Sequence, residues 1–292
     1  MSRRGWKYLA VVSVLAVAVW VVGRSKGGAK VLVKKFNSAV PFEVYRATIG
    51  EEDEYVGTTP AKGSLTVSRG QWWYVQPIPP MDIYKVRQEV QTHAIPGLKI
   101  RDATDAEIAR LRGLTGLRAL DLKDTPATDK TLGYLKGLTN LRYLDLQNTQ
   151  VTNEGLVNLE GLTNLEYLAL GLGARNLTDA GLAHLKGLTE LRELDLTDTQ
   201  LSDDGLAQLA GLTKLRLLHI GGTHVTDAGL VHLKGLKELK WLDLWELDVT
   251  DAGLAHLQWL PNLEHLNLAA TGVTEDGAEE LKKCLPDLKI YW

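Results

Sequence analysis

Histidine is the residue type in this chain most suited to chemistry at neutral pH, because its imidazole binds metals and exchanges protons near pH 7. The 292-residue chain contains seven histidines. Three of them, His184, His232 and His256, each follow Ala or Val and precede Leu in similar segments. No acidic or cysteine ligand recurs with them, so duplication of one segment explains their spacing better than a metal site does. We expect no metal and no cofactor.

Nucleophilic catalysis also lacks a candidate. The sequence contains no G-x-S-x-G, P-loop, H-E-x-x-H or protein-kinase motif. Its single cysteine, Cys284, cannot form an internal disulfide, and we expect it to be a buried small hydrophobe beside Leu285. The acidic run at 51–54 lacks the alternating spacing of a calcium loop. We therefore predict that the protein is not an enzyme.

Aromatic and acidic residues at alternate positions are more informative. Trp241, Asp243 and Trp245 are two residues apart, and side chains at this spacing lie on one face of a β-strand. Indoles beside a carboxylate are typical of recognition surfaces. The same positions in related segments complete the predicted ligand-binding set: Tyr143, Asp145, Tyr167, Asp195, His219, Trp241, Asp243, Trp245 and His265.

A leucine repeat must position these side chains. From Leu117 onward the sequence repeats LxxLxLxxTx[VL][TS]Dx[GT]LxxLxGLxx, with successive leading leucines 24, 24, 26, 24, 24 and 24 residues apart. These leucines are Leu117, Leu141, Leu165, Leu191, Leu215, Leu239 and Leu263. One repeat is too small to bury its own apolar face, so the pattern predicts stacked repeats with a continuous core.

Each repeat reads as a strand followed by a helix. In the strand around Leu144, the leucines face the core while Tyr143 and Asp145 face away from it. The pair Thr178-Asp179 is typical of a helix start, with a hydroxyl cap and an acid at the positive helix end. We expect Gly187 and its equivalents to adopt a left-handed helix end. Recurring threonines such as Thr149 are expected to bond turn backbone groups of adjacent repeats.

The repeat, with TDAGLAHLKGL at 178–188 and TDAGLAHL at 250–257, resembles bacterial leucine-rich-repeat proteins of the ribonuclease-inhibitor-like class. The resemblance implies an α/β fold: a right-handed leucine-rich-repeat solenoid with a parallel concave sheet and convex helices. It also implies a non-catalytic interaction module that binds protein, peptide or glycan on the concave face. The alternatives are a structural scaffold without a specific ligand and a substrate-adaptor or effector protein. A net charge of -3 provides no field that would gather nucleic acid.

The N-terminus reads as a targeting or transmembrane segment, residues 1–28. An uncharged run from Tyr8 to Gly23 lies between basic residues, and its sixteen residues fall just short of the ~17 to 25 that span a bilayer. An uncleaved membrane anchor is favoured, and the alternative is a cleaved signal peptide with Ala16 and Ala18 as its A-x-A site. In either case we expect the bulk of the protein outside the cytoplasm, anchored to the membrane or secreted.

Short β-prone runs separated by turn residues occupy 29–95 and predict a small β-rich domain. The stretch EYVGTTP, with G-T-T-P at Gly57 to Pro60, is similar to the PEGA-type β-domain of bacterial envelope proteins. The expected domains are thus the targeting segment 1–28, the PEGA-like domain 29–95, and the leucine-rich-repeat domain 96–292 with a cap at each end.

Overall fold

The computed structural model describes residues 19–24, 30–36, 38, 40–47, 54–59, 65–68, 72–78, 81–172 and 176–292. The chain divides into two compact units, Met1–Lys99 and Ile100–Trp292. The boundary expected between residues 95 and 96 lies just before this division. We call the second of these the repeat unit.

The described part of the first unit is built from β-strands and one helix. Three strands pair in the antiparallel order β1-β2-β5, and four more run in the order β7-β6-β3-β4. Their bounds are β1 Val19–Arg24, β2 Lys30–Phe36, β3 Phe42–Ala47, β4 Glu54–Thr58, β5 Leu65–Ser68, β6 Trp72–Pro77 and β7 Gly97–Lys99, with helix α1 at Ile83–His93. Phe42, Val44, Val75 and Val86 are buried there.

The targeting segment expected over 1–28 lies mostly outside the described residues. Its described portion, Val19–Arg24, is strand β1 and pairs antiparallel with β2 rather than continuing a helix. The run VWVV explains this difference, because valine and tryptophan favour strands over helices. In the described ranges, no helix is both long enough and apolar enough to cross a membrane.

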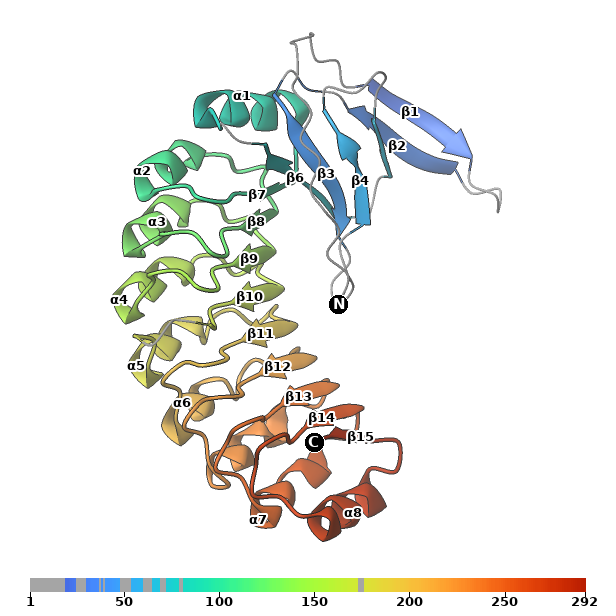
Figure 1. The fold of residues 1–292 in the computed structure, drawn as a ribbon, viewed down its shortest axis with the longest axis vertical. Helices are drawn as coiled ribbons and strands as arrows, with labels where there is room; N and C mark the ends of the chain where they lie inside the picture. Colours follow the sequence, from blue (N-terminus) through green and yellow to red (C-terminus); the bar gives the residue numbers. More distant parts are fainter. Residues whose placement is uncertain are drawn as a thin grey trace. The chain divides into compact units, whose positions relative to one another are not determined.

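The repeat unit contains eight short parallel strands, β8 to β15, each paired with the next along the chain. Figure 1 shows these strands lining the inner, concave side of the unit, with helices on the outer side. The strands are β8 Ala119–Asp121, β9 Tyr143–Asp145, β10 Tyr167–Ala169, β11 Glu193–Asp195, β12 Leu217–His219, β13 Trp241–Asp243, β14 His265–Asn267 and β15 Lys289–Tyr291. A solenoid with a parallel sheet and outer helices is confirmed.

Most of the outer helices are short. They are α2 Asp105–Ile108, α3 Asp129–Leu135, α4 Asn153–Leu156, α5 Asp179–Leu182, α6 Asp203–Gln208, α7 Asp251–Leu254 and α8 Glu275–Cys284. Several run on into 3-10 turns, and one repeat has only the 3-10 helix Gly229–Gly235. A 3-10 helix rises more per residue than an α-helix, so a few residues cover the outer face of each repeat.

Leucine packing follows the predicted alternation. In strand β9 and the turn after it, Leu144 and Leu146 are fully buried, as are Leu242 and Leu244 in and after β13. The outer helices add Leu182 to the same core. Leucines therefore fill the interior from both sides, and the side chains between them are left to the concave face.

A carboxylate ladder joins successive repeats. Asp227 at the start of the 3-10 region accepts two hydrogen bonds from Thr250 of the following repeat, one from its backbone N–H (2.8 Å) and one from its hydroxyl (2.6 Å). The same pair of bonds links Asp105 to Thr128, Asp129 to Thr152, Asp179 to Ser202, Asp203 to Thr226 and Asp251 to Thr274. Asn153 makes the equivalent contact with Thr178, accepting from its N–H and donating to its hydroxyl. We call these contacts the Asp–Thr ladder.

Glycine makes room for this ladder. A Cβ atom at Gly205 would overlap the carboxylate of Asp179, and Gly155, Gly181, Gly229, Gly253 and Gly277 are constrained in the same way by the acid or amide of the preceding repeat. In the repeat that has Thr131 at this position, its hydroxyl donates to Asp105 Oδ1 at 2.5 Å. Burial opposes ionisation of Asp105, but the hydrogen bonds from Thr128 and Thr131 outweigh it and lower its pKa.

Three local expectations are wrong. Gly187 does not have positive φ, and among its equivalents only Gly113 does, at 79°. The other left-handed residues stand in the turn after a strand, with φ between 52° and 67° at Asp102, Asp124, Asn148, Leu172, Asp198, Gly222, Glu246 and Ala270. The hydroxyl of Thr149 donates to Leu146 O of its own repeat, because the three-residue turn brings that carbonyl within 2.7 Å. Cys284 is exposed, since Leu281 and Leu285 take the buried positions at the end of α8.

The ladder predicts that substituting one glycine of a repeat destabilises the protein, whereas substituting another glycine of the same repeat does not. Gly205→Ala should lower the free energy of unfolding by about 1 to 3 kcal/mol, because its methyl group displaces the Asp179 carboxylate. Gly211→Ala is the control, because a Cβ there has no atom within 4 Å. Urea unfolding followed by circular dichroism measures both, and equal stability of the two variants would contradict the proposed role of the ladder.

Candidate concave binding face

Strand register arranges the concave side chains in three columns. The first column contains Ala119, Tyr143, Tyr167, Glu193, Leu217, Trp241, His265 and Lys289. The second column contains Asp121, Asp145, Ala169, Asp195, His219, Asp243, Asn267 and Tyr291. The third lies just after the strands and contains Arg101, Lys123, Gln147, Gly171, Thr197, Gly221, Trp245 and Ala269. All nine predicted site residues lie in these columns.

The acids of the second column are held by their own backbone. Oδ1 of Asp145 accepts a hydrogen bond from the N–H of Gln147 (2.9 Å), and Asp195 makes the same contact with Thr197 (2.9 Å). Asp243 does so more weakly with Trp245, at 3.4 Å. Such Asx turns stabilise the tight bend after the strand. Each carboxylate thus has a structural role that uses one of its oxygens and fixes its direction.

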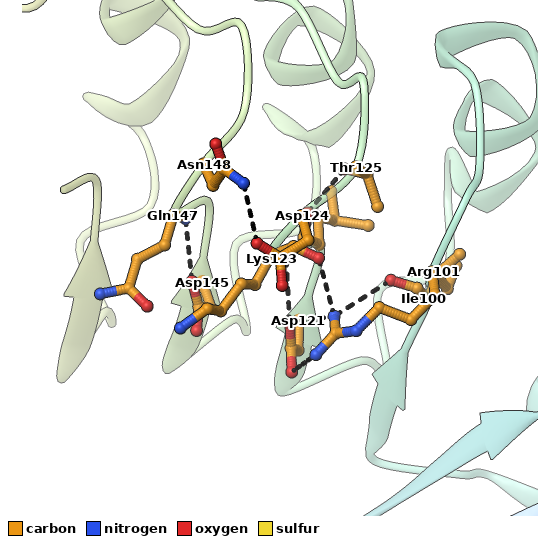
Figure 2. A network of polar contacts seen from close by, with 10 residues as sticks. Ile100, Arg101, Asp121, Lys123, Asp124, Thr125, Asp145, Gln147 and Asn148 are labelled. Atoms are coloured by element: carbon orange, nitrogen blue, oxygen red, sulfur yellow. Dashed lines mark hydrogen bonds and ion pairs between the residues drawn. The ribbon is translucent and has the colours of Figure 1, made fainter. Parts of the chain in front are cut away.

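Arg101 belongs to this face, although we did not select it from the sequence. Figure 2 shows its guanidinium directed at Asp121, with Nη1–Oδ1 and Nη2–Oδ2 distances of 2.7 and 3.2 Å. Nη1 also donates to the carbonyl oxygen of Lys123 at 2.9 Å. A fork of this kind binds a carboxylate through two parallel hydrogen bonds. The signal that could have identified it is the position of Arg101 in the third column, one repeat before Asp121.

The first pair of aromatic residues is stacked. The rings of Tyr143 and Tyr167 lie 4.1 Å apart and nearly parallel. Burial and nearby acids raise the pKa of both phenols, so they remain neutral. Beside them, the amide of Gln147 donates to Asp195 Oδ2 at 2.5 Å. This bond passes over Ala169, whose small side chain stands between Asp145 and Asp195 in the second column. These predicted site residues therefore form one cluster.

Asp145 is the most perturbed carboxyl of the face. Burial, and then the negative charge of Asp121, raise its pKa from 3.8 to about 7. The amide of Gln147 and the charges of Lys123 and Arg101 act in the opposite direction without cancelling this effect. The side chain is thus close to half-protonated at neutral pH.

His219 stands among three acids. Its Nδ1 lies 3.5 Å from Asp243 Oδ2, and Asp195 is its partner in the register with strand β11. Burial lowers the pKa of the imidazole, but Asp243, Asp195 and Glu193 outweigh that effect and raise it. Glu193 is half-buried, and burial raises its pKa. One carboxylate oxygen of Glu193, Oε2, is buried without a hydrogen-bond partner.

An aromatic stack forms at the C-terminal end of the face. Trp241 and His265 have ring centroids 4.7 Å apart, and Tyr291 lies 5.6 Å from Trp241 and 5.8 Å from His265. The Tyr291 hydroxyl is also 2.7 Å from His265 Nδ1. Tyr291 was not in the predicted set, because its strand is out of phase with the leucine pattern: Leu288 stands one residue before Lys289, whereas Leu263 stands two residues before the equivalent His265.

Trp245 does not join this stack. A Cβ atom at Gly221 would overlap its indole, and one at Gly222 would lie 3.3 Å from its Cη2. The indole therefore packs against the backbone of the preceding repeat, in the space that two glycines leave open. Trp241 and Trp245 flank Asp243 in sequence, but they have different surroundings.

Metal-binding residues are not assembled on the described surface. In the ranges that the structure places, no three His, Cys, Asp or Glu side chains are grouped so as to hold an ion. On the outer side, His184 contacts Glu160 at 2.6 Å instead. What the concave face can offer a ligand is therefore hydrogen bonding, charge and aromatic surface.

Comparison with known proteins identifies the repeats. A family model described as Leucine Rich repeat matches residues 137–159 and 188–210. The chain carries leucine-rich repeats. Its structure is similar to the crystal structure of an internalin C2 from Listeria monocytogenes, with a TM-score of 0.52 and 26% sequence identity, covering 69% of this chain and 80% of that chain. A search of curated proteins gives no match. The PEGA-like and targeting segments lie outside the family match and stay predictions.

Asp145 should make the stability of the leucine-rich-repeat unit depend on pH. Its folded pKa of about 7 exceeds its unfolded value, so the folded state binds more protons between about pH 4 and 7. The stability that protonated Asp145 contributes is therefore complete below about pH 4 and is lost as the pH rises through 7. Asp145→Asn keeps the acceptor for Gln147 and removes this loss.

Urea unfolding at pH 5 and pH 8 measures the effect. From pH 5 to pH 8 the advantage of Asp145→Asn over wild type should grow by about 2 to 3 kcal/mol, because part of the loss already occurs between pH 4 and pH 5. Asp204→Asn, which removes an exposed acid on α6, is the control for the loss of one charge. An advantage that is the same at both pH values would refute the assignment.

The packing of Trp245 predicts a coupled pair of substitutions. Gly221→Ala should cost about 1 to 3 kcal/mol in the wild-type background, because its methyl group overlaps the indole. In the Trp245→Ala background the same substitution should be nearly neutral. A double-mutant cycle of thermal unfolding measures this coupling, and additive effects would show that the two residues do not touch.

Proposed function

We propose that the protein is a non-catalytic interaction module that binds a protein partner on the concave face of its leucine-rich repeats. The observation that carries this proposal is the stack of Trp241, His265 and Tyr291 beside Asp243. Leucines already fill the core, so these rings are not needed for packing the solenoid. Tyr291 keeps 41% of its surface exposed. Half-exposed aromatics next to acids are the residues that typically dominate binding energy.

Rigidity supports the same assignment. The parallel sheet and the Asp–Thr ladder hold each concave position at a fixed spacing, and stacking orients the aromatic rings before any partner arrives. A surface that is ordered in advance loses little side-chain entropy on binding. Peptide and glycan ligands fit this surface by the same contacts, through hydrogen bonds to the acids and stacking on the rings.

A structural scaffold without a specific ligand is the second candidate. It is favoured by the Asx turns of Asp145, Asp195 and Asp243, which give these acids a reason to recur that needs no partner. It does not account for Trp241, His265 and Tyr291, which make no such turns. The two candidates therefore differ in what they expect of the aromatic stack.

We also propose that residues 1–28 direct the chain to the bacterial envelope, as an anchor or a signal, and that residues 29–95 form a small domain between this segment and the repeats. The support is the basic residues before Tyr8 and the uncharged residues that follow them, ahead of strand β1 at Val19–Arg24. The repeats would then face partners outside the cytoplasm.

Affinity capture from an envelope extract tests the proposed function. The full chain is the bait, and Trp241→Ala/Tyr291→Ala is compared with wild type. Each lost aromatic should cost about 2 kcal/mol in binding, so a partner held by wild type should be strongly depleted from the variant. Quantitative mass spectrometry of the captured proteins measures this difference.

Trp259→Ala is the matched control, because Trp259 is 51% exposed on the outer side, in the 3-10 turn Leu257–Trp259. Melting temperatures of all three proteins show whether the variants are folded. Partners captured equally by wild type and the concave variant would place binding elsewhere and favour the scaffold.

A further inference from the structure

The third column supplies cations only to the first acids of the face. Arg101 binds Asp121, and the positive charge of Lys123 acts on Asp145. One repeat before Asp195 the equivalent residue is Gly171, and one repeat before Asp243 it is Gly221. Neither glycine can supply a cation, and a Cβ at either would overlap its neighbours. The face between β10 and β13 therefore presents acids without the partner that Asp121 has.

Arg101 shows how this face holds a guanidinium. The fork binds both carboxylate oxygens of Asp121 and the carbonyl oxygen of Lys123, two residues further on. The same two acceptors recur at Asp195 with the carbonyl of Thr197, and at Asp243 with the carbonyl of Trp245. Each of these carbonyls accepts one backbone N–H, from Leu172 and Gly222 respectively, and a carbonyl oxygen can accept two.

The carboxylates of Asp195 and Asp243 also have unused hydrogen-bond acceptor positions. Asp195 accepts one bond on Oδ1 from Thr197 and one on Oδ2 from Gln147. Asp243 accepts one long bond from Trp245 and faces the imidazole of His219 at 3.5 Å. A carboxylate offers about four acceptor positions. Both acids can therefore take a further donor without breaking the Asx turns that hold them.

Charge on this part of the face is not balanced within it. Three acids, Glu193, Asp195 and Asp243, surround the single imidazole of His219. Glu193 Oε2 and Trp241 Nε1 are buried polar atoms without a hydrogen-bond partner. The aromatic stack of Trp241, His265 and Tyr291 borders the same region, and guanidinium groups stack well on aromatic rings. Carboxylates and carbonyls accept hydrogen bonds from a guanidinium group, and aromatic rings stack on it, so the ligand group that fits all three is the arginine side chain.

We propose that the concave face between β10 and β13 binds a basic, extended segment of a partner protein, with two arginine side chains on Asp195 and Asp243 in the manner of Arg101 on Asp121. This inference rests on the proposed function and names its partner class.

Strand spacing sets the period of the segment. Asp195 and Asp243 are two strands apart, which corresponds to roughly 10 Å. In a polyproline II segment, residues three apart point the same way and are separated by about 9 Å. Arginine at every third position therefore matches the two acids, whereas adjacent arginines do not.

Two peptides of equal charge and composition test this match. The periodic peptide has two arginines three residues apart, in Pro-Pro-Arg-Pro-Pro-Arg-Pro-Pro. The clustered peptide has the same two arginines adjacent, in Pro-Pro-Pro-Arg-Arg-Pro-Pro-Pro. Fluorescence anisotropy with labelled peptides measures binding to the full chain in a mild non-ionic detergent. The periodic peptide should bind at least about tenfold more tightly, because one arginine of the clustered peptide would lose its charge-assisted hydrogen bonds.

Protein variants locate the contact. Asp195→Asn/Asp243→Asn should weaken binding of the periodic peptide at least about tenfold. Asp204→Asn/Asp276→Asn removes the same charge from exposed positions on α6 and α8 and should leave binding nearly unchanged. Circular dichroism melts check that both variants are folded. The asparagine side chains can still accept the backbone bonds of the Asx turns.

Equal binding of the two peptides, or equal loss in the two double variants, would reduce the effect to net charge and overturn the inference. No binding of the periodic peptide would also overturn it. If envelope partners still depend on Trp241 and Tyr291 while the peptide does not bind, the proposed function stands and only the basic segment is rejected. If the peptide binds as expected but no captured partner depends on Trp241 and Tyr291, the role of the aromatic stack is rejected and the binding of a basic segment stands.

Discussion

The bidentate contact between the acid of one repeat and the hydroxyl residue of the next is the constraint on which this structure depends. Leucines bury apolar surface, but burial alone does not fix how far one repeat slides along another. The Asp–Thr ladder does, because each carboxylate must meet both an N–H and a hydroxyl of the following repeat. The glycine that recurs near the start of the outer helices from Gly155 to Gly277 follows from it, since a methyl group there would occupy the carboxylate site. Where the loop is two residues longer, Asn153 makes the contact with Thr178 across 25 residues instead of 23.

Because successive repeats are held at a constant offset, equivalent residues of the sequence repeat lie side by side and form the concave surface. Tyr143 stacks on Tyr167, and Trp241 on His265, because the ladder and the sheet place equivalent residues side by side. The concave side carries little of the packing, so its residues vary from repeat to repeat at low cost. Gly221 and Trp245 show the limit of this freedom, since a large side chain in one repeat requires a small one in the repeat before it.

The sequence predicted what depends on periodicity inside a repeat and missed what depends on contact between repeats. Alternating leucines correctly placed the strands and all three concave columns. The helix-start acids were assigned to the helix dipole, whereas Asp227 bonds Thr250 one repeat later. Arg101 and Tyr291 were missed because they lie in the first and last repeats, where the spacing or the phase of the leucine pattern changes. Residues Val19–Arg24 were read as part of a membrane helix. A hydropathy pattern contains no information on strand pairing, and these residues pair with β2.

The structural role of the concave acids supports the binding role that we propose for them. An Asx turn commits one carboxylate oxygen to the backbone, and in doing so it fixes the direction of the other. Asp121 already shows the consequence, because its turn with Lys123 coexists with the bidentate contact from Arg101. A carboxylate held in this way pays little conformational entropy when a cation arrives. In the binding mode that we propose, duplication of the repeat keeps these acids for folding, while the residues of the third column decide which acids the chain neutralises itself and which are left for a partner.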